Sequence, residues 1–165
     1  MADFADESEV YTYLSHRLGE KGLRILGTRV GAGRLSPDID ILAEREGRRI
    51  GIEVKYFRAP FKLYEGLSEA LALLSQDLDE VYLLHVFDSS IGGLARWLAQ
   101  RTAELVKLTP IGYMVMVGRS DPEVLVKARG NPLKEAALRR RALRGASPAK
   151  EGAEPVATGA AREAG

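Results

Sequence analysis

Three acidic side chains and one lysine in the stretch SPDIDILAEREGRRIGIEVKYF, residues 36–57, have types and spacing suited to chemistry. They are Asp38, Asp40, Glu53 and Lys55. Carboxylate oxygens are the ligands that Mg²⁺ and Mn²⁺ prefer. Like charges held close together raise each other's pKa unless a cation intervenes. If the fold gathers these side chains, the stretch predicts a site for a divalent metal ion beside an ammonium group.

The same stretch has the pattern of two strands joined by a tight turn. Apolar and polar residues alternate on both sides of the sequence REGR at 45–48, which is the signature of half-buried strands. Gly47 can supply the positive φ that a hairpin turn needs. With Glu46 and Gly47 as the turn residues, Asp40 lies opposite Glu53, and paired residues project from the same face of a sheet.

This register places Asp38 opposite Lys55, so that all four polar side chains share one face. The other face is filled by apolar side chains: Ile39, Ile41, Ile52 and Val54. A turn shifted by one residue toward the N-terminus would instead place Asp38 opposite Glu53.

The dipeptide Pro37-Asp38, followed by Glu53-Val54-Lys55, resembles the signature of the PD-(D/E)xK nuclease superfamily. Within it, residues 7–88 are most similar to archaeal Holliday-junction resolvases and related restriction-endonuclease-like proteins. The resemblance implies a Mg²⁺- or Mn²⁺-dependent endonuclease that hydrolyses DNA phosphodiester bonds, on branched or repair intermediates. It also implies a homodimer, because resolvases of this type act as dimers.

The resemblance and the hairpin register select different aspartates. The motif selects Asp38, which follows the proline, whereas the register selects Asp40 as the partner of Glu53. We expect Asp40 and Glu53 to be the main metal ligands, with Asp38 as an auxiliary group. Lys55 would orient or help deprotonate the attacking water and stabilise the phosphate oxygens.

Members of the superfamily often add a glutamate from the first helix to the metal site. Glu9 is our candidate for this role, with Glu7 as the second choice. The alternative interpretation is that both glutamates simply interact with the dipole of the helix N-terminus.

Basic residues are distributed unevenly along the chain. Residues 1–118 carry 14 Lys/Arg against 17 Asp/Glu, whereas residues 119–150 carry 9 against 3. A basic C-terminal segment fits a polyanionic partner, and a solvated helix surface is the alternative. The candidates for contacts with DNA are Arg29, Arg34, Arg58, Arg139, Arg140, Arg141 and Arg144.

Hydrophobic periodicity predicts the element order αβββαβαββα. Helices are expected at 7–21, 63–78, 91–107 and 132–143, and strands at 23–30, 38–44, 48–56, 81–87, 112–117 and 124–128. The expected fold class is α/β: a restriction-endonuclease-like core with a mixed sheet flanked by helices, plus a C-terminal strand pair and a basic helix. Residues 1–145 would form one domain, and 146–165 a disordered tail.

Composition excludes several other classes of site. The chain has no cysteine, which removes disulfides, thiolate zinc sites and cysteine nucleophiles, and it has two histidines, too few for a histidine-rich metal site. We expect His85 to be a hydrogen-bonded core residue, His16 to be exposed and Trp97 to lie in the core.

Seventeen arginines against seven lysines, without cysteine, fit a thermophile. No apolar run is long enough for a membrane span and no secretory signal is visible, so we expect a cytoplasmic protein.

A second function remains open from the sequence. The chain could be a catalytically inactive protein of the nuclease fold that binds nucleic acid or a protein partner without cutting. A third interpretation is a structural hairpin whose charges are only solvated.

Overall fold

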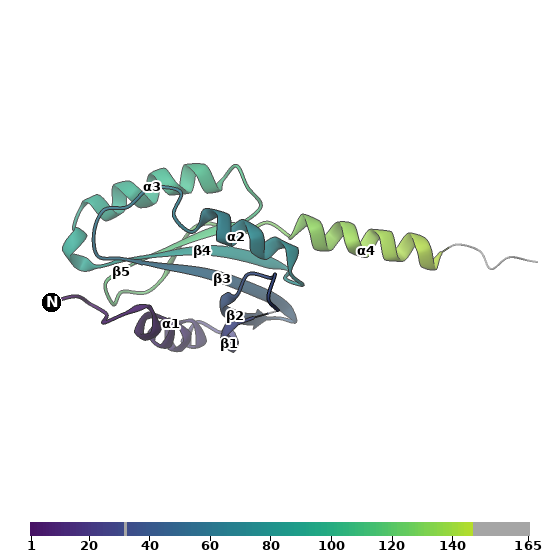
Figure 1. Cartoon of the computed structure of the whole chain (residues 1–165), viewed down its shortest axis with the longest axis horizontal. Helices are drawn as coiled ribbons and strands as arrows, with labels where there is room; N and C mark the ends of the chain where they lie inside the picture. Colours follow the sequence, from purple (N-terminus) through teal and green to yellow (C-terminus); the bar gives the residue numbers. More distant parts are fainter. Residues whose placement is uncertain (32, 147–165) are drawn as a thin grey trace, which may run out of the picture.

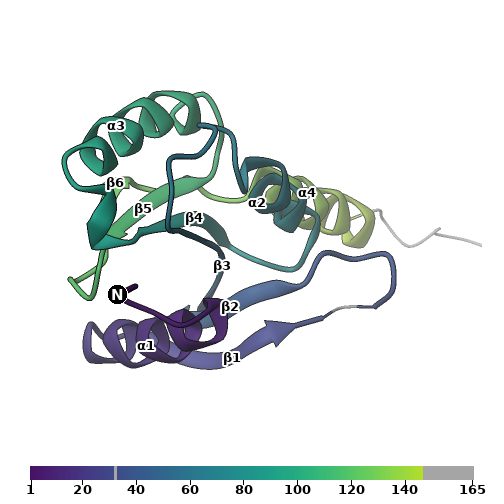
Figure 2. The ribbon, with the colours of Figure 1, turned by 60° about the vertical axis from the view of Figure 1, so that its left-hand side comes forward.

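The computed structural model describes residues 1–31 and 33–146, which form an α/β fold around a six-stranded mixed sheet (Figure 1). α1 covers one face of the sheet, and α2 and α3 cover the other (Figures 1 and 2). The helices are α1 (Glu7–Glu20), α2 (Leu67–Ala72), α3 (Leu94–Val106) and α4 (Pro132–Gly145), with short 3₁₀ turns η1 (Leu73–Ser75) and η2 (Ser89–Ile91). The strands are β1 (Arg24–Val30), β2 (Ile39–Arg45), β3 (Arg48–Phe57), β4 (Glu80–Phe87), β5 (Gly112–Val117) and β6 (Glu123–Val126).

The spatial order of the strands follows their order in the chain. β1, β2 and β3 are antiparallel neighbours, β3, β4 and β5 are parallel, and β6 is antiparallel to β5. Parallel neighbours need a crossover connection, and the segments that contain α2 and α3 provide it. The predicted element order and the α/β class with a mixed sheet are confirmed.

The β2–β3 hairpin has the register predicted from its turn. Glu46 and Gly47 have φ angles of 52° and 75°, and positive φ at both central residues is the mark of a type I′ turn. Arg45 pairs with Arg48, and the ladder continues to the pair Ile41–Ile52. The alternative register, shifted by one residue, is therefore excluded.

Each face of the sheet has its own apolar core. On the α1 side, Val10 and Leu14 of the helix belong to one buried cluster with Ile41, Ile52 and Val54 of the hairpin. On the α2 and α3 side, a second cluster includes the following residues: Leu73, Leu83, Phe87, Leu98 and Tyr113. Seven of the eight residues of β4 are buried, as expected for a strand covered on both faces.

Two expectations about the helices were wrong. The helix expected at 63–78 forms only from Leu67, because Gly66 has a φ of 77°, a left-handed conformation that an α-helix excludes. Trp97 was expected in the core but is 53% exposed, because the inner face of α3 is occupied by Ala95, Leu98 and Ala99.

α4 projects from the end of the sheet rather than packing on it (Figure 1). The tail that was predicted to be disordered lies outside the described residues from residue 147 onward. Within residues 1–31 and 33–146, none of the helices combines the length and the apolar character that crossing a membrane requires.

Candidate active site

Glu53 and Lys55 lie side by side on β3, at the centre of the sheet. Residues two apart in a strand project from the same face, and Glu53 pairs with Leu83 of β4, which belongs to the core beneath α2 and α3. The Lys55 Nζ atom is 3.1 Å from Oε1 of Glu53. Glu53 is only 5% exposed, so this lysine is the nearest compensation for a nearly buried carboxylate.

α2 brings another carboxylate to the same lysine. Oε1 of Glu69 lies 3.3 Å from the Lys55 Nζ atom. The approach is close because Gly66 precedes the helix: a Cβ atom there would lie 2.8 Å from the Cγ atom of Lys55 and 2.8 Å from a methyl group of Leu83. A glycine at this position lets the start of α2 rest directly on the lysine side chain.

Asp40 lies where β2 and β3 separate. The backbone ladder ends at Ile41–Ile52, and the Val54 N–H donates instead to Oδ2 of Asp40 over 2.8 Å. A side-chain carboxylate thus replaces a backbone acceptor, and the strand alternation is lost at this point. Ile39 packs in the core under α2 and α3, so its predicted position on the face of Ile41 was wrong.

Burial sets the protonation of this group of side chains. Burial and the neighbouring charge of Asp40 raise the pKa of Glu53 to about 7, although Lys55 opposes the shift. Burial also raises the pKa of Asp40, against the hydrogen bond from Val54, the Tyr11 hydroxyl and the charge of Lys55. Burial alone would lower the pKa of Lys55, but Glu53 and Glu69 outweigh it and raise the pKa. Lys55 is therefore protonated at neutral pH, and both carboxylates are destabilised as anions.

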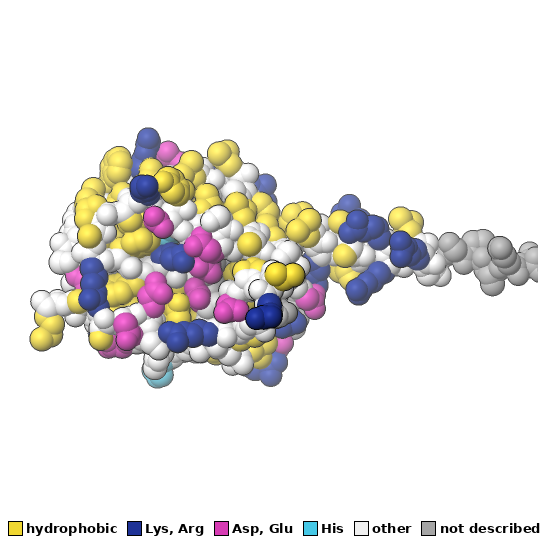
Figure 3. All heavy atoms as spheres, in the orientation of Figure 1, with side chains coloured by type: hydrophobic (Ala, Val, Ile, Leu, Met, Phe, Trp, Pro, Cys, Tyr) yellow, Lys and Arg dark blue, Asp and Glu magenta, His cyan; other side chains and the backbone are white. Residues whose placement is uncertain are grey.

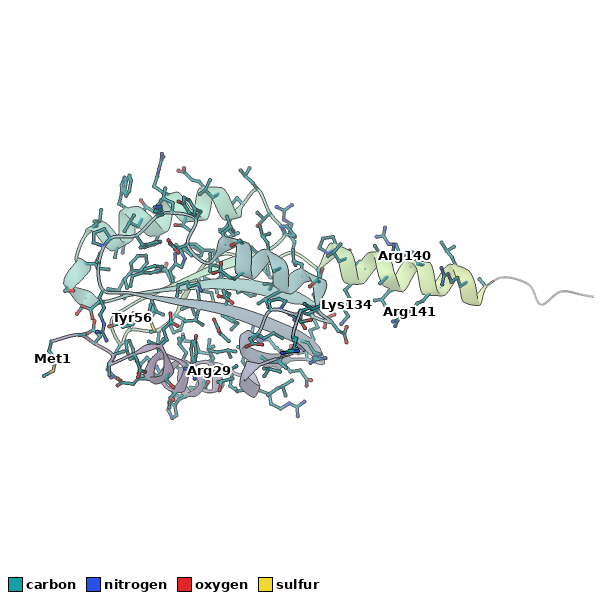
Figure 4. All side chains as sticks on the ribbon, in the orientation of Figure 1. Met1, Arg29, Tyr56, Lys134, Arg140 and Arg141 are labelled. Atoms are coloured by element: carbon teal, nitrogen blue, oxygen red, sulfur yellow. The ribbon has the colours of Figure 1, made fainter. Side chains whose placement is uncertain are left out.

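Two residues of α1, Tyr11 and Glu7, act on Asp40. The Tyr11 hydroxyl donates to Oε2 of Glu7 over 3.4 Å, and burial followed by the charges of Asp40 and Glu7 raises the pKa of Tyr11. The guanidinium of Arg29 lies over the Tyr11 ring, 5.3 Å from its centroid. Arg29, labelled in Figure 4, has a φ of 51°, which is uncommon for a residue with a side chain. The predicted phosphate contact Arg29 thus packs on Tyr11.

Glu9 is not brought to this group. Its Oε2 accepts a hydrogen bond of 2.7 Å from the Ala5 N–H, and its Oε1 pairs with Arg119. The same hydrogen bonds lower the pKa of Glu9. Asp6 caps α1 by accepting from the Glu9 N–H, so Glu9 belongs to the helix N-terminus and to the link with Arg119. Of the two first-helix candidates, Glu7 is the one whose charge acts on Asp40.

The other predicted residues lie around the group or away from it. Asp38 is exposed and faces the β1–β2 loop, since a Cβ on Gly31 would lie 2.8 Å from its Oδ1 atom. Arg34 is exposed in the same loop. Arg58 donates to the backbone carbonyls of Phe4 and Ala5 and therefore holds the N-terminal segment.

The four arginines of the C-terminal segment lie on α4, outside the body of the molecule. Figure 3 shows this separation: acidic and basic side chains are mixed on the visible side of the body, while basic side chains line the projecting helix.

His85 is the buried histidine expected from the sequence. It is fully buried on β4, with Nδ1 3.0 Å from the Tyr113 hydroxyl oxygen and Nε2 2.8 Å from the Glu65 carbonyl oxygen. Because only a donor can bond to a carbonyl, Nε2 carries the proton and Nδ1 accepts from Tyr113. Burial lowers the pKa of His85 to about 4, so the ring is neutral. This histidine holds the segment that leads into α2.

Two members of the group were not selected from the sequence. Tyr11 follows Glu7 by four residues, which places both on one side of α1, and this spacing was an available signal. Glu69 reaches Lys55 through the backbone turn at Gly66, and the helical pattern expected over 63–78 did not indicate that turn. Among residues 1–31 and 33–146, no group of three or more His, Cys, Asp or Glu side chains is arranged to hold a metal ion.

Comparisons with known proteins define no family for this chain. No protein-family model matches it, and no curated protein is significantly similar to it in sequence. A structure of an XisH family protein from Nostoc punctiforme PCC 73102 is 18% identical, covers 66% of this chain and 90% of its own, and has a TM-score of 0.47. A fdxN element excision controlling factor protein from Anabaena variabilis is also 18% identical, with coverage of 66% and 89% and a TM-score of 0.46.

A third solved structure is less similar. Pyrococcus furiosus SfsA in complex with Ca²⁺ is 12% identical, with coverage of 74% of this chain and 62% of its own and a TM-score of 0.36. At these identities and scores the function has to be argued from the chain's own residues.

Proposed function

We propose that this chain is a metal-dependent nuclease that hydrolyses phosphodiester bonds in DNA, with branched or repair intermediates as the expected substrates. One observation carries the proposal: Asp40 lies where β2 leaves β3, and its charge acts on Glu53, whose Oε1 atom is 3.1 Å from the Lys55 Nζ atom. Glu53 is nearly buried, and Asp40 and Glu53 both have raised pKa values. Carboxylates in such surroundings are stabilised as anions when a cation binds between them.

The donor set fits Mg²⁺ or Mn²⁺. Asp40 and Glu53 would supply carboxylate oxygens, and the remaining positions would be filled by water, by backbone carbonyls of β3 and by phosphate oxygens of the substrate. Mg²⁺ commonly keeps several waters and takes only one or two protein carboxylates. Two ligands, rather than three, are therefore sufficient, with Glu7 and Asp38 near the margins of the site.

The metal, when bound, would lower the pKa of a water and offset the charge of the scissile phosphate. Lys55 is protonated at neutral pH because Glu53 and Glu69 raise its pKa, so it acts as a positive charge toward phosphate oxygens rather than as a base. Glu69, whose Oε1 atom lies 3.3 Å from the Lys55 Nζ atom, is a second anion that holds this ammonium group. Arg29, held over the Tyr11 ring, adds a second cation for the nucleic-acid backbone.

The test is incubation with Mg²⁺ or Mn²⁺ and a panel of junction, flap, linear duplex and single-stranded DNAs. We expect cleavage of at least one substrate by the wild type and none by Glu53→Gln or Lys55→Ala. Glu44→Gln is the matched control, since Glu44 is a carboxylate of the same hairpin that pairs with Arg24. Cleavage that survives Glu53→Gln would exclude this site.

A binding protein of the nuclease fold that does not cut is the second candidate. It is favoured by one observation: Glu9, the expected first-helix ligand, is bound by Arg119 and Ala5 instead. This candidate predicts that Mg²⁺ stabilises the protein in a thermal-shift titration while every substrate in the panel stays intact.

A further inference from the structure

α4 differs from the other helices of the described chain in its exposure. Every residue from Leu138 to Ala146 is exposed, and the helix has no buried residue at all. Figure 1 shows it extending from the body as a free arm. An isolated helix of this length is marginal in water, so a partner would stabilise it.

The base of this arm is firmly attached. Asn131 is 1% exposed, and its Nδ2 atom donates to the Leu74 and Leu78 carbonyls, each over 2.9 Å. Its Oδ1 atom accepts from the Leu133 N–H over 3.1 Å and caps the helix. Its own backbone N–H donates to the Asp79 carbonyl over 2.9 Å. The direction in which α4 leaves the sheet is thereby set by buried hydrogen bonds.

An ion pair repeats the attachment one turn later. The Lys134 Nζ atom lies 2.9 Å from Oδ1 of Asp79 and 3.1 Å from Oδ1 of Asp77 (Lys134 is labelled in Figure 4). From Leu138 to Ala146 every residue is exposed. A rigid base with a free outer half is the arrangement expected of an element that reaches into a partner.

The charge of the arm indicates the chemistry of that partner. α4 contains five basic residues and one acidic residue. The basic residues are Lys134, Arg139, Arg140, Arg141 and Arg144, and the acidic residue is Glu135. Lys134 is occupied by its two aspartates, which leaves the four arginines for a polyanion.

The arrangement of the arginines indicates the shape of the partner. Successive residues of an α-helix point about 100° apart, so Arg139, Arg140 and Arg141 spread over roughly 200° of the circumference. Arg140 and Arg141 leave different sides of α4 in Figure 4. A flat anionic surface could meet only one or two of these side chains, whereas the two walls of a groove could meet all of them.

We infer that α4 enters the major groove of double-stranded DNA and contacts phosphates on both of its walls. A helix with its side chains is about 10–12 Å wide, and the major groove of B-form DNA is about 12 Å wide. The major groove of duplex RNA is deep and narrow and excludes such a helix. The inference rests on the proposed function, because it names the form of nucleic acid that is presented to the Asp40–Glu53–Lys55 site.

The experiment measures binding without cleavage. The full chain, free of divalent metal, is titrated against a fluorescent DNA duplex and against an RNA duplex of the same sequence, at several salt concentrations. We expect the DNA duplex to bind more tightly. Arg139→Gln, Arg140→Gln and Arg141→Gln should each weaken binding. With Arg144→Gln added, the quadruple variant should lower the slope of log K against log salt by about 0.9 per lost phosphate contact.

The matched control is the double variant Arg96→Gln/Arg101→Gln, which removes two exposed arginines from α3 on the body. It should leave binding of the duplex unchanged. Circular dichroism of the quadruple variant should match the wild type, because none of the replaced side chains is buried.

Three results would each overturn the inference: unchanged duplex affinity in the quadruple variant, an effect confined to one of the three consecutive arginines, or equal affinity for duplex RNA. Light scattering that shows a dimer broken by the quadruple variant would overturn it too, because α4 would then pair with a second copy. If the wild type cleaves DNA but the α4 variants bind the duplex as tightly as the wild type, this inference fails and the proposed nuclease function stands. If duplex binding depends on α4 but no substrate is cleaved, the proposed nuclease function fails and this inference stands.

Discussion

At the scale of single residues, Glu53 is a side chain whose charged form the protein alone stabilises poorly. It is almost fully buried, its pKa is raised to about 7, and Lys55 is shared between it and Glu69. A protein that retains such a carboxylate gives up stability at that position. The cost is understandable if the group is needed to bind a cation.

The two aspartates should differ in importance. Asp40 accepts the Val54 N–H and interacts electrostatically with Glu53, whereas Asp38 is exposed and faces the β1–β2 loop. We expect Asp40→Asn to abolish Mg²⁺ binding and cleavage, and Asp38→Asn to reduce cleavage less than tenfold. Cleavage rates and calorimetric Mg²⁺ titrations of the two variants provide the measurement. An Asp38→Asn protein as inactive as Asp40→Asn would show that the motif, not the register, selects the ligand.

The raised pKa of Glu53 predicts a specific pH dependence of stability. In the unfolded chain this carboxyl ionises near 4.5, and in the folded protein near 7. Between these values the folded state binds more protons than the unfolded state, so its contribution to the free energy of unfolding falls as pH rises. The expected loss, without divalent metal, is on the order of 2–3 kcal/mol.

His85 has the opposite effect and would mask this slope in the wild type. Its pKa falls to about 4 in the folded state, so its contribution to stability grows as pH rises toward 6.5. The measurement is therefore the free energy of unfolding in urea of the wild type and of Glu53→Gln, compared from pH 4.5 to 8. As pH rises, the free energy of unfolding of the variant should increase relative to that of the wild type. A difference independent of pH would mean that Glu53 is ionised throughout.

At the scale of elements, the start of α2 depends on Gly66. The residue has a φ of 77°, and a Cβ atom would crowd Lys55 and Leu83. Gly66→Ala should lower the free energy of unfolding by about 2–4 kcal/mol, the sum of backbone strain and overpacking. Gly22→Ala is the control, since Gly22 has a φ of 89° with nothing within 4 Å of a Cβ. It should cost only about 1 kcal/mol in urea unfolding. Equal losses in both variants would show that crowding at Lys55 is unimportant.

The elements show which features of this fold were predictable. The hairpin register followed from the turn residues Glu46 and Gly47, because local backbone preference alone determines a type I′ turn. The break at Asp40 was not predictable in this way. It depends on a side-chain hydrogen bond to Val54, which competes with the backbone ladder only in the folded sheet. The position of Glu9 away from the candidate site was not predictable for a similar reason, because its partner Arg119 is remote in the sequence.

At the scale of the whole molecule, Mg²⁺ should stabilise the folded state through Asp40 and Glu53. Ligand at about 100 times its Kd adds about 2.7 kcal/mol to the free energy of unfolding. We expect Tm to rise with Mg²⁺ at pH 8 in the wild type and in Glu44→Gln, but not in Glu53→Gln. The rise should shrink below pH 7, where protonation of Glu53 competes with the metal. An identical rise in all three proteins would place the metal elsewhere.

The global arrangement was predictable because the αβββαβαββα order leaves few ways to cover both faces of one sheet. The sequence pattern did not predict contacts between side chains of different elements, such as Lys55 with Glu69. It also did not predict that α4 projects from the body. Trp97 illustrates the same difficulty, since its exposure depends on which side of α3 the sheet occupies.

The attachment of the N-terminal segment has a consequence for synthesis on the ribosome. The Asp3 N–H donates to Asp88 over 2.8 Å, Arg119 donates to the Asp3 carbonyl over 3.1 Å, and Phe4 is 1% exposed. Asp3 therefore has its native partners at positions that are translated much later. A nascent chain that ends before Arg119 lacks the contact that closes this segment. Cotranslational folding of the domain can be completed only after that residue has left the exit tunnel, and until then this segment lacks one of its native contacts.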